Sequence, residues 1–158
     1  MSVRIRQADE NDIAWLLPQL HEFAAFFGSR RSLFPESDER AAVIVQGMLD
    51  HPFFIAESRA FAGRLGFIAG TLTPHPYNPD ITVLAETFWW VDPAHRGTRA
   101  GALLLKHFED YGRAHADWIV MTLNVETPVK EETLTRRGYR LKERSYLLEV
   151  NVPAEAVA

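Results

Sequence analysis

Residues 91–105 read V-D-P-A-H-R-G-T-R-A-G-A-L-L-L, and the hydrophobic pattern of the chain changes within them. Residues 81–91, just before, are rich in β-branched and aromatic side chains, which is typical of a strand. After the turn, apolar residues recur at helical spacing: Ala100, Leu103, Leu104, Phe108 and Tyr111. The stretch therefore predicts the end of a strand, a short glycine-containing turn and the start of a helix.

A turn of this kind is suited to an anion. The first amides of a helix have no partner within it, and the helix dipole is positive there. Gly97, Ala100 and Gly101 are small enough to let a phosphate approach the backbone, and Arg96 and Arg99 add cationic donors. From the residues alone, two interpretations stay open: a site for phosphate or another anion, and an ordinary strand-to-helix turn.

The pattern on either side of this stretch predicts an α/β fold. An apolar run at residues 118–123 predicts a central strand buried on both faces. With the strand at 81–91 and the helix between, it forms a βαβ unit, whose two strands should be parallel neighbours. The remaining predicted elements are a strand at 3–7, helices at 9–27 and 37–50, a hairpin of 53–58 and 64–73, a proline-rich loop at 73–80, a helix from Thr127-Pro128 to Gly138, and one or two strands at 139–150.

Composition limits the class of protein. The chain has 158 residues, 47% of them hydrophobic and 24% charged, which fits one folded domain at residues 1–150 and a loose tail at 151–158. The absence of cysteine excludes disulfides and a cysteine nucleophile, and fits a cytoplasmic protein. The six histidines lack metal-ligand spacing, so no metal is expected. A net charge of −4 argues against nucleic acid as a partner, and no apolar run suggests a signal peptide or membrane segment.

The stretch at 91–105 resembles motif A of the GNAT N-acetyltransferases, R/Q-x-x-G-x-G/A after a strand. Arg96 matches its first position and Gly101 its last, whereas Arg99 stands where the family usually has glycine. The resemblance extends to the order of elements over about the first 150 residues, to the opening R-I-R-Q-A-D, and to R-R-G-Y-R at 136–140, which is similar to the family's K-x-G-F ending of the last helix. It implies the GNAT fold: an α/β (α+β) domain with a mixed, mostly antiparallel twisted sheet, a central parallel strand pair and about four helices.

The resemblance also implies a cosubstrate, acetyl-CoA, in the gap where the fourth and fifth strands separate. The backbone around Trp90 and Val91 would pair with the pantetheine arm, and Asn124 lies where the family often contacts the cofactor. The amides of the turn would hold the pyrophosphate; this set comprises Arg96, Gly97, Thr98, Arg99, Ala100, Gly101 and Ala102.

The reaction implied is direct attack of a primary amine on the thioester, which needs no protein nucleophile. Glu86 is the candidate general base, and in an apolar strand its pKa would be raised. Without a bulge, Glu86 would share a strand face with Phe88 and Trp90. The other interpretation is a solvent-facing structural glutamate.

The general acid is not evident. The position at which many family members carry a tyrosine, four residues before Gly138, is Leu134. Tyr111 and Tyr146 are substitutes that could equally be packing aromatics. The alternative function is therefore a non-catalytic CoA-binding module of the same fold. The acceptor amine could be a small molecule or a protein amine, and a homodimer is a further expectation.

Overall fold

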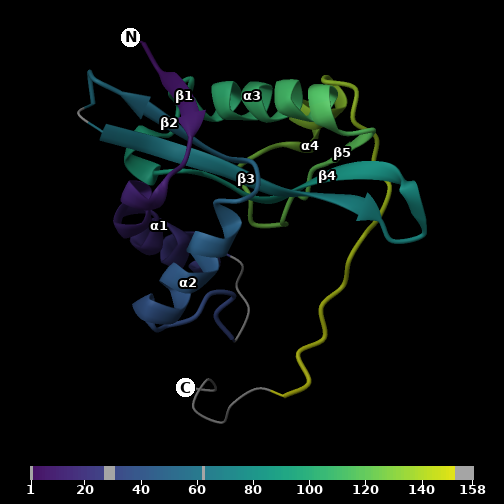
Figure 1. The fold of residues 1–158 in the computed structure, drawn as a ribbon, viewed down its shortest axis with the longest axis horizontal. Helices are drawn as coiled ribbons and strands as arrows, with labels where there is room; N and C mark the ends of the chain where they lie inside the picture. Colours follow the sequence, from purple (N-terminus) through teal and green to yellow (C-terminus); the bar gives the residue numbers. More distant parts are fainter. Residues whose placement is uncertain (1, 27–30, 62, 152–158) are drawn as a thin grey trace.

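The structure is a computed structural model that describes residues 2–26, 31–61 and 63–151. The described residues form a five-stranded sheet in the order β1-β2-β3-β4-β5 (Figure 1). The strands are β1 (Arg4–Gln7), β2 (Phe53–Ser58), β3 (Gly63–His75), β4 (Asn78–Val91) and β5 (Trp118–Val120). The first four strands pair with one another in antiparallel fashion, and β5 runs parallel to β4. The fold class expected from the sequence is confirmed.

Helices cover both faces of the sheet. They are η1 (Glu10–Asp12), α1 (Ile13–Ala25), α2 (Asp38–Met48), η2 (Pro93–His95), α3 (Ala100–His115) and α4 (Glu131–Thr135). Leu16 and Leu20 of α1 pack with Val45 of α2 in a core on one face of the sheet. On the other face, Leu104 and Phe108 of α3 form a second core (Figure 1). Two cores on a single sheet account for the apolar positions of both strands and helices.

The proline-rich segment at 73–80 is not the predicted loop. β3 continues to His75 and β4 begins at Asn78, so the two strands form one long hairpin. β2 pairs with β3 no further than Ala69, which leaves the end of β3 with a partner on one side only. Pro74 can lie in such a strand because its missing amide hydrogen is not needed there.

The prediction for residues 118–123 was partly wrong. The βαβ unit is present, since Val83 pairs with Trp118 and Ala85 with Val120 in parallel register. The second strand, however, is only three residues long and lies at the end of the sheet, with Trp118 47% exposed. Its apolar run resembles that of a central strand, but no described strand pairs with its outer edge.

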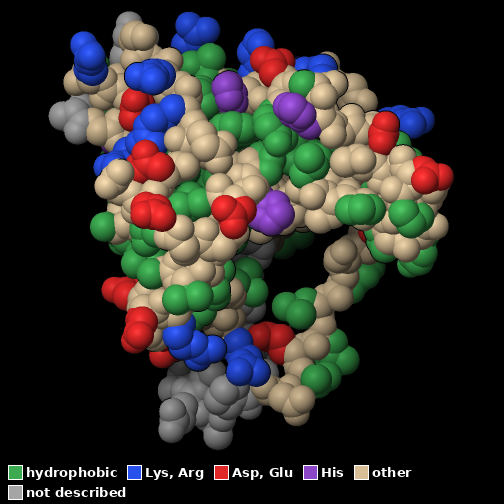
Figure 2. Space-filling model, in the orientation of Figure 1, with side chains coloured by type: hydrophobic (Ala, Val, Ile, Leu, Met, Phe, Trp, Pro, Cys, Tyr) green, Lys and Arg blue, Asp and Glu red, His purple; other side chains and the backbone are tan. Residues whose placement is uncertain are grey.

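The end of the chain also differs from the prediction. α4 begins at Glu131, after an N-cap at Lys130, rather than at Pro128. Residues 139–150, which we name the C-terminal arm, contain no strand and run beside the domain with most side chains exposed. Figure 2 shows the opening between this arm and the body of the molecule. Most of the predicted tail, residues 152–158, lies outside the described residues.

Candidate active site

A cavity of about 560 Å³ opens where β4 and β5 separate. Their pairing ends at Ala85 and Val120. Beyond that point, β4 forms one wall of the cavity and residues 122–129 form the opposite wall. The end of α1 and the start of α3 complete the lining. The βαβ unit thus brings residues that are 30 or more positions apart in sequence around one space.

A β-bulge at Thr87 determines how β4 faces this cavity. Gly70 of β3 pairs with Glu86 and Ala69 pairs with Phe88, so Thr87 is the extra residue. A Cβ at Gly70 would meet Phe108 of α3, which places Glu86 on the α3 side of the sheet. Phe88 and Trp90 pack in the core beneath α1 and α2. The shared face expected without a bulge is therefore not formed: the bulge reverses the alternation and puts Glu86 on the side opposite Phe88 and Trp90.

Glu86 lies just beyond the last pair of the parallel ladder. The backbone N–H of Thr122 donates to Glu86 Oε2 at 3.3 Å, so the carboxylate joins β4 to the segment that follows β5. Burial raises the pKa of Glu86 to about 7, although the hydrogen bond from Thr122 opposes the shift. A carboxyl group that titrates near neutrality and lines a cavity is suited to exchanging protons.

The turn before α3 has the predicted strand–turn–helix form. The Asp92 carboxylate accepts a hydrogen bond from the Ala94 amide at 2.9 Å and so shapes the turn of η2. Gly97 has φ +81°, a left-handed conformation that favours glycine. The Thr98 hydroxyl donates to the His95 carbonyl and accepts from the amide of Ala100, the first residue of α3.

The residues expected to hold the cofactor divide into two groups. Those that line the cavity are Trp90, Val91, Arg96, Gly97, Thr98, Gly101 and Asn124. Arg99, Ala100 and Ala102 do not line it: Arg99 and Ala102 are exposed, and the Ala100 side chain is buried in the α3 core. These three residues are sequence neighbours of the lining residues Thr98 and Gly101, but none of them lines the cavity itself.

Arg96 lies across the aromatic side of the cavity. Its guanidinium carbon is 4.6 Å from the ring centroid of Trp90 and 5.1 Å from that of Phe26. Its Nε also donates to the Val91 carbonyl at 3.3 Å. The side chain therefore contacts both the strand and the end of α1.

Several lining residues were not anticipated from the sequence. They are Phe23 and Phe26 at the end of α1, Thr87 at the bulge, and Glu126 in the opposite wall. Behind them, Gln19 Oε1 accepts from Trp90 Nε1 at 2.9 Å, and Gln19 Nε2 donates to Asp92 at 3.2 Å. A glutamine among the apolar positions of α1 was the available signal, because a buried amide needs partners.

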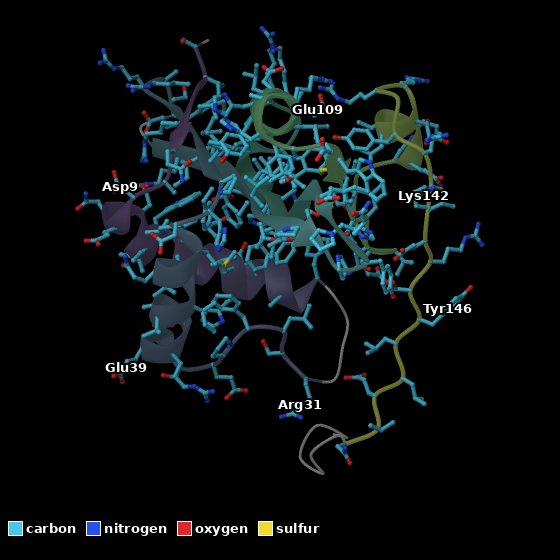
Figure 3. All side chains as sticks on the ribbon, turned by 45° about the vertical axis from the view of Figure 1, so that its right-hand side comes forward. Asp9, Arg31, Glu39, Glu109, Lys142 and Tyr146 are labelled. Atoms are coloured by element: carbon cyan, nitrogen blue, oxygen red, sulfur yellow. The ribbon has the colours of Figure 1, made fainter. Side chains whose placement is uncertain are left out.

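The tyrosines considered as general acids lie away from the cavity lining. Leu134 is buried on α4. Tyr111 contacts the rings of Phe54 and His115. Tyr146, on the C-terminal arm, is 91% exposed and points outward (Figure 3). Among the described residues that line the cavity there is no tyrosine.

Other kinds of site find little support in the described part of the chain. The residues described include no cluster of three or more histidine or acidic side chains arranged to bind a metal. Of the helices described, none has both the length and the apolar character that crossing a membrane requires.

The fold and the cavity define a class: small α+β domains that open a ligand site between two parting parallel strands beside a helix N-terminus. Within this class, the chain belongs to the acetyltransferase (GNAT) family, whose model matches residues 19–132. A search of proteins with curated functions gave no significant match.

Solved structures share the fold at low sequence identity. A transcriptional regulator from Bacillus halodurans C-125 superposes with a TM-score of 0.73 at 18% identity, covering 94% of this chain and 100% of the other. A ribosomal-protein-alanine N-acetyltransferase from Brucella melitensis biovar Abortus 2308 superposes with a TM-score of 0.70 at 17% identity, covering 95% of this chain and 100% of the other. Glucosamine-6-phosphate N-acetyltransferase from Arabidopsis thaliana superposes with a TM-score of 0.68 at 13% identity, covering 96% of this chain and 100% of the other. Likeness at these identities supports the fold and leaves the substrate open.

Proposed function

We propose that the chain transfers an acetyl group from acetyl-CoA to a primary amine. The observation that carries this proposal is the cavity in which Glu86 and the first turn of α3 face the same space. Acyl transfer by direct attack needs both features: an anion site for the phosphates of the donor, and a group that accepts the proton of the amine. Membership of the acetyltransferase family supports the same reaction class.

In this proposal, the turn before α3 binds the pyrophosphate of acetyl-CoA. Gly97 and Gly101 leave the backbone open to a phosphate, and Arg96 supplies a cation. The pantetheine arm pairs with the backbone of Trp90 and Val91, on the side of β4 from which β5 has separated. Asn124 faces it from the opposite wall. Arg99, exposed outside the cavity, acts on the phosphates only at longer range.

The chemistry follows from this placement. Glu86 or a water bound to it takes one proton from the ammonium form of the acceptor, and the freed lone pair attacks the thioester carbonyl carbon. A C–N bond forms, and the C–S bond breaks with its electron pair on sulfur. Since no tyrosine is among the described lining residues, CoA leaves as the thiolate and takes its proton from water.

The test combines binding with turnover. Acetyl-CoA should raise the melting temperature, because a ligand that binds only the native state stabilises it by about 2.7 kcal/mol at 100 times its Kd. A thiol-release assay with a panel of primary amines then measures transfer. No thermal shift at millimolar acetyl-CoA would contradict both the binding site and the reaction.

A second candidate is a CoA-binding module without catalysis. Leu134 favours it, because a buried leucine cannot supply a proton to the leaving thiolate. This candidate gains if acetyl-CoA stabilises the protein but no amine in a broad panel releases CoA. Light scattering of the same sample tests the expected homodimer.

A further inference from the structure

Acidic side chains outnumber basic ones among the described residues that line the cavity. The charged residues among them are Glu86, Glu126 and Arg96. Arg96 is thus the one cation in this part of the lining, and the proposed function directs it to the phosphates of the donor. Once Arg96 is paired there, neither carboxyl group has a cationic partner in the described lining; Glu86 is partly buried and Glu126 is exposed. Charges of one sign attract a ligand of the opposite sign more strongly where water is partly excluded.

The same cavity contains an aromatic corner that is suited to a cation. It consists of Phe23, Phe26 and Trp90. The rings of Phe26 and Trp90 lie 5.3 Å apart at 74°, and those of Phe23 and Trp90 lie 6.0 Å apart at 87°. Trp90 is held in place by the hydrogen bond from its Nε1 to Gln19.

The corner already holds a cationic side chain, that of Arg96. Its guanidinium lies over Phe26 and Trp90, within the distance at which cation–π attraction operates. The corner combines the end of α1 with Trp90 of β4, whereas the turn expected to bind phosphate directly precedes α3. A guanidinium drawn to the donor phosphates would therefore vacate the corner and leave it open to another cation.

We propose that the acceptor is an amine carrying a second cationic group, which binds in the aromatic corner where the Arg96 guanidinium now lies. The second group is an ammonium or a guanidinium, and the attacking amine reaches the Glu86 end of the cavity. This inference rests on the proposed function for the reaction, but the cation site itself can be tested by binding alone.

The test uses chain-length-matched amines. Agmatine and 1,5-diaminopentane carry a second cation, whereas hexylamine ends in a methyl group. In a thiol-release assay with saturating acetyl-CoA, kcat/KM for the two dications should exceed that for hexylamine at least tenfold. Phe26→Leu should reduce this ratio at least threefold. The matched control is Phe61→Leu, because Phe61 is similarly exposed (42%, against 39% for Phe26) but does not line the cavity.

Calorimetric titration of agmatine and hexylamine into CoA-saturated protein separates the two hypotheses. Phe26-dependent binding of agmatine without turnover would retain the cation site and reject the transferase. Turnover with equal kcat/KM for hexylamine and agmatine would reject the cation site and retain the transferase. Equal affinities for the two amines, or an agmatine preference that survives Phe26→Leu, would also overturn the inference.

Discussion

At the scale of single residues, the site depends most on Glu86. It follows the last pair of the parallel ladder, and its carboxylate accepts from the amide of Thr122, two residues beyond the end of β5. Burial raises its pKa to about 7, so near neutral pH the carboxyl group exists in both protonation states. The sequence indicated an acidic residue in an apolar strand and the direction of its pKa shift. The side of the strand depended on a bulge at Thr87, and Gly70 opposite it on β3 was the available signal.

Glu86→Gln should lower kcat at least tens of times if Glu86 is the general base, since such help contributes about 10²–10⁴ in rate. The base works only when deprotonated, so the wild-type rate should rise with pH through about 7. The variant should lose that acidic limb and keep its affinity for acetyl-CoA. Measuring kcat as a function of pH at saturating acetyl-CoA, for the wild type and the variant, checks this. Wild-type turnover with unchanged pH dependence would assign Glu86 a structural role.

Gly101 offers a graded test of the phosphate site. A Cβ there would lie 3.4 Å from Val91 Cγ2 and 4.0 Å from Trp89, which is ordinary contact. Gly101→Ala should therefore fold normally, with melting temperature equal to or above that of wild type because alanine favours helix. Gly101→Val adds branches that reach into the cavity and should weaken acetyl-CoA binding about tenfold or more. Titration calorimetry on both variants measures the difference, and wild-type affinity in a folded valine variant would move the phosphate elsewhere.

At the scale of elements, the sequence was most informative where the hydrophobic periodicity agrees with the residues that begin and end helices and strands. The helix after the turn, the β2–β3 hairpin and the parallel pairing of β4 with β5 were all predicted. The extension of the hairpin through Pro74 was missed, because whether a proline fits depends on which side of the strand is paired. The short β5 was missed for a related reason, since an apolar run does not reveal how many neighbours a strand has.

A buried carboxylate joins three of these elements. Asp12, at the end of η1, is fully buried and accepts from Arg6 of β1 at 2.7 Å and from Arg64 of β3 at 2.6 Å. Burial alone would raise its pKa, but hydrogen bonds from Arg6, the Asp9 amide and Arg64 outweigh burial and hold the pKa at about 2.

This network predicts acid sensitivity. The folded-state pKa of Asp12 lies below its ordinary value of 3.8, so its stabilising contribution is complete above that pH and is lost as the pH falls toward 2. The shift corresponds to about 2 kcal/mol. Asp12→Asn should lower the free energy of unfolding at pH 7 and flatten its dependence on pH between 4 and 2, roughly the window between the two pKa values. Denaturant unfolding at several pH values checks this, and an unchanged pH slope would contradict it.

At the scale of the whole molecule, the wall of the cavity opposite β4 depends on how the C-terminal residues are attached. Residues 122–129 connect β5 to α4, and α4 is held to α3 by an ion pair. Arg137 donates to both oxygens of Glu109, with Nε at 2.7 Å from Oε1 and Nη2 at 2.5 Å from Oε2. Glu109 of α3, labelled in Figure 3, is only 2% exposed.

The sequence at 136–140 suggested the end of a helix, and in the structure Arg137 of that segment pairs with Glu109 of α3. Arg137 lies two residues beyond the end of α4, so its pair with Glu109 attaches the C-terminal end of α4 to α3. Sequence alone could not select Glu109 as the partner, since α3 also carries Asp110 one residue later. Asp110 pairs instead with Lys106 on the exposed face of the same helix.

These two neighbouring acids allow a matched test of whether the wall matters to the site. Glu109→Gln removes the charge that Arg137 contacts twice and should lower the melting temperature by several degrees, since hydrogen bonds to charged groups contribute about 1.5–3 kcal/mol. It should also weaken acetyl-CoA binding severalfold at temperatures where the variant is folded, because residues 122–129 lose their anchor. Asp110→Asn removes two exposed ion pairs, with Lys106 and Arg113, and should change both quantities little. Thermal melts and acetyl-CoA titrations of the two variants measure both effects. If Glu109→Gln melts early but binds acetyl-CoA as wild type does, the ion pair stabilises the fold while the cavity wall is held by other contacts.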